Sequence, residues 1–452
     1  MTSLKIAVEG CGHGMLDEIY DELAKACHLR DWTLKDLDFL IICGDFQAMR
    51  NEQDLNCMSC PKRYRALGDF HKYYSGEKKA PVLTIVIGGN HEASNYFTEL
   101  HHGGWLAPNI YYLGEVNVIR YGPYRIAGMS GIYKSRTYQR PRNARLPYDR
   151  KEISNVYHVR ERDVSKLLHV KEPVDICLSH DWPRRVEWHG DYEALFRAKP
   201  HFLESARIDS LGNAPAEQVM SFLRPLYWFS GHMHVRYSAT VHHNEDADIF
   251  KYVSVREDFR AQLPRSMTRH ANLVKKTAPK SVSAAITNKL TRFLALDKPG
   301  PGHKFLETLV INDCASKEQD IRELYMERTA EGKFSLYYDE EWLAIIRSTS
   351  NSTSESGLDA ESTKVHTGTT RGSTEDMLWV RDNITAKTLL RIPHDFEMVA
   401  PAHGSLEFKN IGEQPQEYPN PQTEKFCKLL GIQNKFSVDQ SFDDEHGFIT
   451  FG

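Results

Sequence analysis

The amino-acid sequence predicts an α/β fold in which the strands end along one common edge. Two observations support this prediction. Short apolar runs recur along the first half of the chain, and each one stops abruptly at glycine or at a polar residue. Apolar residues at helical spacing follow the first run, at Leu16, Ile19, Tyr20 and Leu23. An apolar run that ends in glycine is typical of a buried strand entering a tight loop, and the helical spacing indicates an amphipathic helix.

Six buried strands are expected in this half of the chain. In chain order they cover residues 4–8, 39–43, 82–87, 126–129, 174–178 and 226–229. Open α/β sheets present their chemistry at the carboxyl ends of the strands. The residues that directly follow these runs are therefore candidates for a functional site.

The composition is that of a globular protein with more than one domain. The 452 residues are enough for two or three domains of roughly 150 residues each, and 40% hydrophobic residues suffice for a sizeable core. A net charge of −4 identifies no partner by itself. The scattered cysteines, including Cys57 and Cys60, are interpreted as ordinary thiols in a reducing compartment. No apolar run approaches the roughly 20 residues of a membrane helix, so no membrane partner is expected.

The chain changes character after residue 255, and we predict a catalytic domain over 1–255. Residues 256–292 carry nine Lys and Arg against two acids and are expected to form a basic, mobile insert. A C-terminal domain is predicted over 293–411. Its expected elements are a strand, two helices and a disordered Ser/Thr-rich tract, at 305–311, 341–347, 377–390 and 348–374. Residues 412–452 have little to bury and are expected to form a flexible tail.

Five short motifs place metal-binding residue types at the ends of expected strands. In order they are Cys11-x-His13, Gly44-Asp45, Gly89-Asn90-His91-Glu92, His180 and Gly231-His232-x-His234. Imidazole, amide and carboxylate groups bind divalent metals, and a carboxylate suits the bridge between two ions. We therefore expect Asp45 to bridge two metal sites. The first site would be held by Cys11, His13 and His234, and the second by Asn90, His180 and His232.

The last motif needs an unusual backbone. His232 and His234 lie two residues apart, so both reach one edge only if the chain twists sharply, and Gly231 is expected to supply the twist. A single Gly-Asp or Gly-Asn-His motif occurs by chance, and an isolated histidine at a strand end is more often structural. Five such motifs in order, each after an apolar run, favour a metal centre.

The series resembles the calcineurin-like metallophosphoesterases, whose pattern is D-x-H, G-D, G-N-H-[DE], H and G-H-x-H. The resemblance implies a β-sandwich flanked by helices, with a smaller C-terminal domain, and hydrolysis of phosphate esters at one or two divalent ions. Cys11 stands where that family has aspartate. Because a thiolate is a softer ligand than a carboxylate, Fe²⁺, Zn²⁺ or Mn²⁺ is expected in preference to Mg²⁺.

The residues around the motifs resemble one branch of that superfamily, the RNA lariat debranching enzymes. The matching stretches are E-G-C-G-H-G-x-L-D, G-G-N-H-E-A-S-N-Y, G-G-W-L-A-P-N-I-Y-Y-L-G, L-S-H-D-W-P and Y-W-F-S-G-H-M-H. This resemblance implies a hydrolase that cuts the 2′,5′-phosphodiester bond at the branch of lariat RNA, and a nuclear location. His91, which has no metal role in this assignment, is expected to protonate the departing 2′ oxygen as a general acid.

A stretch between the third and fourth motifs mixes cations with aromatic residues, as binding of single-stranded RNA requires. The candidate RNA-binding residues are Tyr133, Lys134, Arg136, Tyr138, Arg140, Arg142, Arg145 and Tyr148, together with Trp182. The resemblance implies that residues 132–158 form a lariat recognition loop. The alternative interpretations are a solvated loop and, for Trp182, plain core packing.

Two other functions stay open from the sequence alone. A calcineurin-like enzyme could act on a phosphoprotein or on DNA, although the basic, aromatic stretch argues against a phosphoprotein. A catalytically silent RNA-binding adaptor could share the fold, although the complete set of ligand motifs argues against it.

Overall fold

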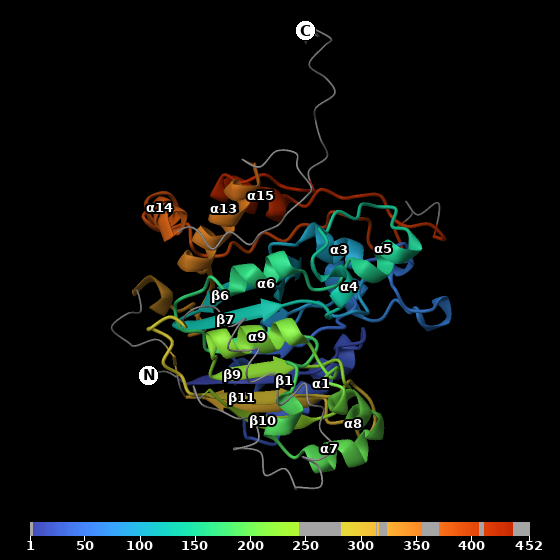
Figure 1. The fold of residues 1–452 in the computed structure, drawn as a ribbon. Coiled ribbons are helices and arrows are strands. Elements are labelled where there is room, and N and C mark those ends of the chain that lie inside the picture. Colours follow the sequence, from blue (N-terminus) through green and yellow to red (C-terminus); the bar gives the residue numbers. More distant parts are fainter. Residues whose placement is uncertain are drawn as a thin grey trace.

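The computed structural model describes residues 3–243, 282–312, 314–315, 323–354, 370–405 and 411–436. Two mixed β-sheets lie face to face in this part of the chain (Figure 1). The first runs in the order β12 (Leu306–Ile311), β1 (Leu4–Glu9), β2 (Phe39–Ile42), β3 (Thr84–Val86), β5 (Ile110–Tyr112) and β4 (Gly104–Ala107). The second runs in the order β10 (Tyr237–His242), β11 (Leu290–Ala295), β9 (Tyr227–Ser230), β8 (Ile176–Ser179), β7 (Tyr124–Met129), β6 (Val116–Tyr121) and β13 (Leu336–Tyr338).

Alternate residues of the central strands point into the layer between the sheets. Ile6 and Val8 of β1 belong to one buried cluster with Ile126 of β7 and Phe229 of β9. Ala7, between them, belongs to the cluster on the opposite face of its sheet. This alternation follows from the two-residue repeat of a strand. Because both faces of each sheet are covered, the central strands are apolar throughout, which makes them recognisable as continuous runs in the sequence.

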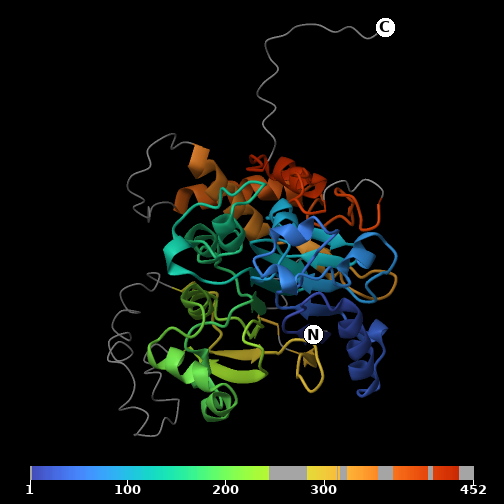
Figure 2. The same cartoon turned by 90° about the vertical axis from the view of Figure 1, so that its right-hand side faces the viewer.

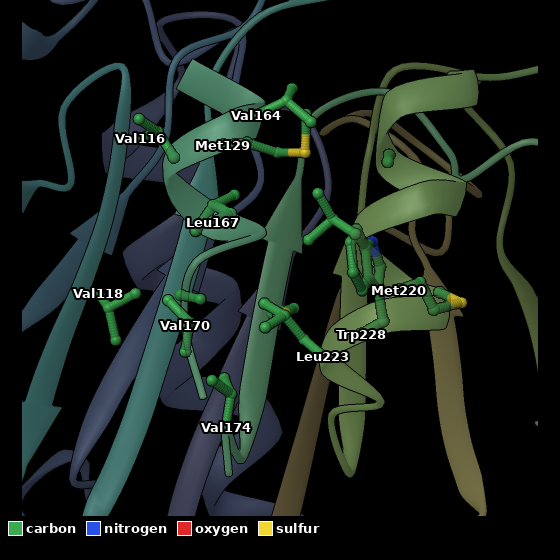
Figure 3. Close-up of a cluster of buried hydrophobic side chains, with 14 of the residues drawn as sticks. Val116, Val118, Met129, Val164, Leu167, Val170, Val174, Met220, Leu223 and Trp228 are labelled. Carbon is green, nitrogen blue, oxygen red and sulfur yellow. The ribbon is translucent and has the colours of Figure 1, made fainter. Parts of the chain in front are cut away.

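Helices cover the outer face of each sheet. The first sheet is covered by α1 (Leu16–His28), α2 (Phe70–Tyr74) and α3 (Ser94–Glu99). The second is covered by α6 (Glu161–Leu167), α7 (Tyr192–Ala198), α8 (Pro200–Arg207), α9 (Ala214–Leu223), α13 (Glu340–Ser354) and α14 (Thr370–Val380). Figure 3 shows part of this second layer, where Leu167 of α6 and Leu223 of α9 join Val118 of β6 and Trp228 of β9 in one cluster.

The remaining elements are short or lie at the periphery. They are the helices α4 (Ser135–Tyr138), α5 (Arg150–Asn155) and α15 (Pro421–Leu430), the 3₁₀ turns Leu34–Asp36, Asp54–Cys57, Lys62–Tyr64, Val186–His189 and Glu323–Met326, and the π-helical turn Arg381–Thr385. None of the helices in the described part of the chain combines the length and apolar character that a membrane span requires.

The C-terminal part of the chain completes both sheets. β12 pairs antiparallel with β1, with Ile311 opposite Leu4, and β11 lies between β9 and β10. β13 forms the other edge of the second sheet by pairing with β6. The helices of this part, orange and red in Figure 2, gather on one side of the molecule. The predicted domain boundary at residue 255 lies outside the described residues.

The β-sandwich flanked by helices is confirmed, and all six expected strands are present with somewhat different ends. The strand expected at 82–87, for example, covers only Thr84–Val86. The sequence prediction did not include β4, β5, β6, β10, β11 and β13. These strands are short or lie in the outer parts of the sheets, so they lack the long apolar run that marks a central strand.

The expectation of a flexible tail from residue 412 is wrong for 411–436. Helix α15 begins at Pro421 after the Asn420 side chain accepts a hydrogen bond from the backbone of Gln422, and it buries Phe426 and Leu430. The prolines of this stretch suggested loop, but proline at the first position of a helix is favourable, because its missing N–H is not needed there. Residues 437–452 lie outside the described part.

Three further boundaries differ from the sequence prediction. The tract expected to be disordered at 348–374 is helical at both ends, because α13 reaches Ser354 and α14 begins at Thr370; residues 355–369 are not described. The helix expected at 377–390 ends in the π-helical turn, and Thr388 has a left-handed φ of 57°. The basic insert expected at 256–292 ends inside β11, and residues 256–281 lie outside the described part.

Candidate metal centre

The five predicted motifs meet where the parallel strands of the two sheets end. Cys11, Asp45 and Asn90 lie on the loops after β1, β2 and β3 of the first sheet. His180 follows β8 of the second sheet, and His232 lies in the loop after β9. The face-to-face packing of the sheets therefore brings together side chains that are more than 200 residues apart in sequence.

One group of donors gathers around Cys11, His13, Asp45 and His234, whose ligand atoms all lie within 4.8 Å of one another. The Nε2 atoms of His13 and His234 are 3.1 Å apart, and His13 Nε2 lies 3.7 Å from Asp45 Oδ2. Burial lowers the pKa of both histidines to about 4. Both rings are therefore neutral near pH 7 and hold a free lone pair for a metal ion.

A second group lies on the other side of Asp45. His180 Nε2 is 3.2 Å from Asp45 Oδ1 and 3.2 Å from Asn90 Oδ1. The ring of His232 lies beside that of His180, with 4.9 Å between the centroids. His180 Nδ1 is 2.7 Å from the Cys43 carbonyl oxygen, and an N–H that donates there leaves Nε2 to face the group.

Asp45 stands between the two groups, with Oδ2 toward His13 and Oδ1 toward His180. The side chain is almost fully buried, which by itself raises its pKa. The neighbouring histidines outweigh burial, His180 first, and hold the pKa of Asp45 well below its usual value. Imidazole, amide, thiol and carboxylate donors in this arrangement fit divalent ions, and a shared carboxylate fits a pair of them.

Four of these residues adopt a left-handed backbone conformation. His13, Asp45, His232 and His234 have φ values of 45°, 48°, 63° and 47°. The expectation that Gly231 twists the chain is wrong, because the two histidines adopt the left-handed conformation themselves. This conformation costs free energy in residues other than glycine, and strained backbone of this kind is concentrated at functional sites.

Gly231 and Gly89 have no Cβ, and this allows neighbouring backbone and side-chain atoms to lie close to them. A Cβ at Gly231 would lie 2.6 Å from the Gly10 carbonyl oxygen and 2.9 Å from Cys11 Sγ. A Cβ at Gly89 would lie 2.2 Å from Asp45 Oδ1. All three distances are shorter than a carbon atom tolerates, so any side chain at either position displaces a donor of the candidate centre.

Glu92 holds two of the loops together, a role that the sequence analysis did not assign. Its buried carboxylate accepts hydrogen bonds from the backbone N–H groups of Phe46 and Gly89 at 2.8 Å and of Gln47 at 2.7 Å. Burial, followed by the charge of Asp45, raises the pKa of Glu92 to about 8. The only sequence signal for Glu92 was its place at the end of the third motif.

Lys298 is a second residue that the sequence analysis missed. It lies in a Pro- and Gly-rich loop after β11, and the Cys11 N–H donates to the carbonyl oxygen of the preceding Asp297 at 3.2 Å. Burial is the largest cause of the low pKa of His13 and His234, and the positive charge of Lys298 lowers both pKa values further. Lys298 therefore lies near the centre. A strand-like run that ends in Asp-Lys-Pro-Gly was the available signal.

Comparison with known proteins identifies a family for each of two successive parts of the chain. Residues 4–236 match the calcineurin-like phosphoesterase family, and residues 288–435 match the C-terminal domain of lariat debranching enzymes. The lariat debranching enzyme of Arabidopsis thaliana is 39% identical over 95% of this chain and 86% of its own length. The enzyme of Schizosaccharomyces pombe is 36% identical over 96% of each chain, and that of Homo sapiens 37% over 98% of this chain and 72% of its own.

This chain belongs to the lariat debranching enzyme family. Its departure from the calcineurin-like pattern is Cys11, whose sulfur accepts a hydrogen bond from the His232 N–H at 2.8 Å. Burial, followed by the charges of Asp45 and Glu9, raises the pKa of the Cys11 thiol well above its usual value. The thiol thus keeps its proton unless a cation is close.

His91 lies at the edge of this centre. Its backbone N–H donates to Asp45 Oδ1 at 2.8 Å, and its ring centroid is 5.9 Å from that of His13. Unlike His13, it is not among the four residues whose donor atoms lie within 4.8 Å of one another. The half-buried ring therefore borders the candidate centre without belonging to either group of donors.

Side chains that face solvent occur along much of the predicted recognition loop, and its first part carries three exposed cations. Lys134, Arg136 and Arg140 are exposed. The half-buried rings of Tyr133 and Tyr138 lie edge to face, with 5.5 Å between the centroids. These five residues are accessible to a nucleic acid.

Three of the predicted RNA-binding residues are structural instead. Arg142 is partly buried, with 8% of its side chain exposed; it forms ion pairs with Glu115 and Asp163, and it donates to the His158 carbonyl oxygen. Tyr148 is buried beneath the C-terminal segment. Trp182 is also buried; it stacks on Tyr237 and donates to the Gly231 carbonyl oxygen at 3.0 Å. Arg145 is partly exposed and pairs with Glu417 at 3.3 Å.

Gly231→Ala is expected to weaken metal binding about 10- to 100-fold, because the new Cβ pushes against Cys11 and Gly10 and shifts the donors. The measurement is a titration of the purified variant with Zn²⁺ or Mn²⁺ in competition with a chelator. Gly412→Ala is the matched control, because a Cβ there meets open space. Equal metal affinity in both variants would refute the packing argument.

Proposed function

We propose that this chain is a metal-dependent phosphodiesterase that opens lariat RNA by hydrolysing the 2′,5′-phosphodiester bond at the branch. The observation that carries the proposal is Asp45, whose two oxygens face two separate groups of metal-binding side chains. A shared carboxylate between two sets of donors is what two-metal hydrolysis of a phosphodiester needs. Membership of the debranching family supports branched RNA as the substrate.

The side chains of the centre divide into two ligand sets. Cys11, His13 and His234 would hold one ion, and Asn90, His180 and His232 the other, with Asp45 common to both. Bound divalent ions supply Lewis-acid charge to the phosphate oxygens and lower the pKa of water. The sulfur and imidazole donors favour Fe²⁺, Zn²⁺ or Mn²⁺ over Mg²⁺.

His91 supplies the proton for the leaving group in this proposal. Its position is set by the hydrogen bond from its backbone N–H to Asp45, and its ring lies beside that of His13. An imidazolium at this edge can give its proton to the 2′ oxygen as the P–O bond breaks. Lys298, on the side of His13 and His234, can add positive charge toward the phosphate.

The exposed cations and tyrosines of the loop bind the RNA in this proposal. Lys134, Arg136 and Arg140 would contact phosphates, and Tyr133 and Tyr138 would stack on unpaired bases. This surface disfavours a phosphoprotein substrate, and the complete donor set disfavours a silent adaptor. A nuclear location follows from an intron-derived substrate and is part of the proposal.

A synthetic 2′,5′-branched RNA is expected to be cut at the branch, giving linear RNA with a 5′ phosphate, whereas linear RNA of the same sequence stays intact. Gel analysis with equal concentrations of Mn²⁺, Zn²⁺, Fe²⁺ and Mg²⁺ measures both substrate and metal preference, and Mg²⁺ should be the poorest. Equal cutting of linear RNA would indicate a general nuclease, and RNA binding without cleavage would indicate the adaptor. The highest rate with Mg²⁺ would refute the argument from Cys11.

The triple variant Lys134→Ala, Arg136→Ala and Arg140→Ala is expected to bind RNA more weakly and with a smaller salt dependence. Each lost phosphate contact should reduce the slope of log K against log salt by about 0.7. Affinity measured across a salt series gives the slope, and Lys171→Ala, another exposed lysine, is the control. An unchanged slope in the triple variant would remove these residues from the RNA surface.

His91→Ala is expected to slow cleavage of branched RNA by about 10²- to 10⁴-fold, because the leaving oxygen then departs without a proton. Metal content and RNA affinity should change little. A nitrophenyl phosphodiester, whose leaving group needs no proton, separates the roles: the variant should recover most of its activity on it, whereas Asn90→Ala should not. Equal defects on both substrates, or loss of metal, would place His91 among the ligands.

A further inference from the structure

The C-terminal segment 411–436 lies along the middle of the predicted recognition loop. In Figure 1 this segment, in red, runs beside α5, which follows the loop's central part. Residues 139–149 of the loop form neither helix nor strand. Their position therefore depends on side-chain contacts rather than on a regular ladder of backbone hydrogen bonds.

Gln414 pairs with the loop backbone as a neighbouring strand would. The Tyr148 N–H donates to Gln414 Oε1 at 2.8 Å, and Gln414 Nε2 donates to the Tyr148 carbonyl oxygen at 2.8 Å. The side-chain amide of Gln414 thus pairs with both the N–H and the carbonyl oxygen of Tyr148. The contact is partly buried, so its loss would leave backbone groups of a buried residue without these partners.

Glu417 holds the adjacent part of the loop. Its Oε1 accepts a hydrogen bond from the Leu146 N–H at 3.1 Å and lies 3.3 Å from Arg145 Nε. The other end of the segment returns to the same arginine, because the Arg145 guanidinium lies 5.5 Å from the centre of the Phe436 ring. Arg145 is therefore held between the two ends of the C-terminal segment.

The same end of the segment also reaches the buried ion pairs of the loop. Lys435 Nζ lies 3.6 Å from Glu115 Oε2, and Glu115 is also a partner of Arg142. The stretch from Arg142 to Tyr148 is thus held from one side by the core and from the other by the C-terminal segment. Residues 133–140, which carry the exposed cations Lys134, Arg136 and Arg140, directly precede this held stretch in the chain.

We propose that the C-terminal segment positions the recognition loop for RNA, with Gln414 and Glu417 as its positioning residues. Neither residue belongs to the metal centre, so the segment governs binding of branched RNA and not the chemical step. A loop that is already ordered loses less conformational freedom when RNA binds, and affinity is higher for that reason. This inference rests on the proposed function.

The test is the double variant Gln414→Ala and Glu417→Ala. The KM and Kd for branched RNA are expected to rise about tenfold, because the variant loses the two neutral hydrogen bonds of Gln414 and the hydrogen bond and ion pair of Glu417. Saturated kcat, metal content and turnover of a nitrophenyl phosphodiester should stay at the unsubstituted level. Gln416→Ala is the matched control, because this exposed glutamine lies between the two positions.

Hydrogen exchange gives a second, structural measurement. Exchange of the backbone amides of 139–149 should quicken in the double variant, because Leu146 and Tyr148 lose their acceptors, while the central strands stay protected. Glu417→Gln keeps an acceptor for Leu146 but loses the charge that pairs with Arg145. The exchange rate of these amides in the Glu417→Gln variant should lie between the rates in the double variant and in the control.

The possible results separate this inference from the proposed function. Unchanged RNA affinity in the double variant, with or without faster exchange, would overturn the inference alone. Loss of metal or of nitrophenyl phosphodiester turnover would also overturn it, because the segment would then support the whole fold. If the unsubstituted protein turns over the nitrophenyl ester but neither binds nor cuts branched RNA, the proposed function fails and the inference fails with it.

Discussion

The buried carboxylate of Asp45 is the constraint on which the rest of the centre depends. A charge that is removed from water is costly unless it is paired and hydrogen-bonded. Asp45 meets this requirement with the N–H groups of Asn90 and His91 at 2.8 Å and with His180 at 3.2 Å. These partners come from the ends of β3 and β8, so the carboxylate joins both sheets at the place where the chemistry is proposed.

Close approach of the loops then limits which residues can stand around Asp45. Gly89 and Gly44 leave room for Asp45 and His180. A Cβ at Gly89 would lie 2.2 Å from Asp45 Oδ1 and one at Gly44 would lie 2.3 Å from His180 Nδ1, both far inside van der Waals contact. Glu92, in the loop after β3, accepts two backbone hydrogen bonds from the loop after β2 and a third from Gly89 of its own loop. The glycines and the glutamate of the motifs thus act through packing and hydrogen bonding rather than through ligand atoms.

Local patterns carried most of what the sequence could predict. Central strands and the metal-binding motifs are contiguous in sequence, so apolar runs and residue types were sufficient to find them. Partners distant in sequence were not predictable: Arg142 was counted as an RNA contact because composition does not show Glu115 and Asp163 around it. Likewise, nothing in the sequence around Trp182 indicates that its ring stacks on Tyr237. The helix at Pro421 was missed because proline was taken as a breaker and not as a first helical residue.

Protonation distinguishes Cys11 from the aspartate of the calcineurin-like pattern. Burial lowers the pKa of His13 to about 4, so this ring offers its lone pair to a cation without losing a proton near pH 7. Burial has the opposite consequence at Cys11, where a raised pKa keeps the thiol protonated until a cation displaces the proton. The ordinary pKa of an aspartate, roughly 4, lies far below that of a thiol. In the proposed centre, the cysteine would therefore couple metal binding at the first group of donors to proton release, at a position where its sulfur favours a soft ion.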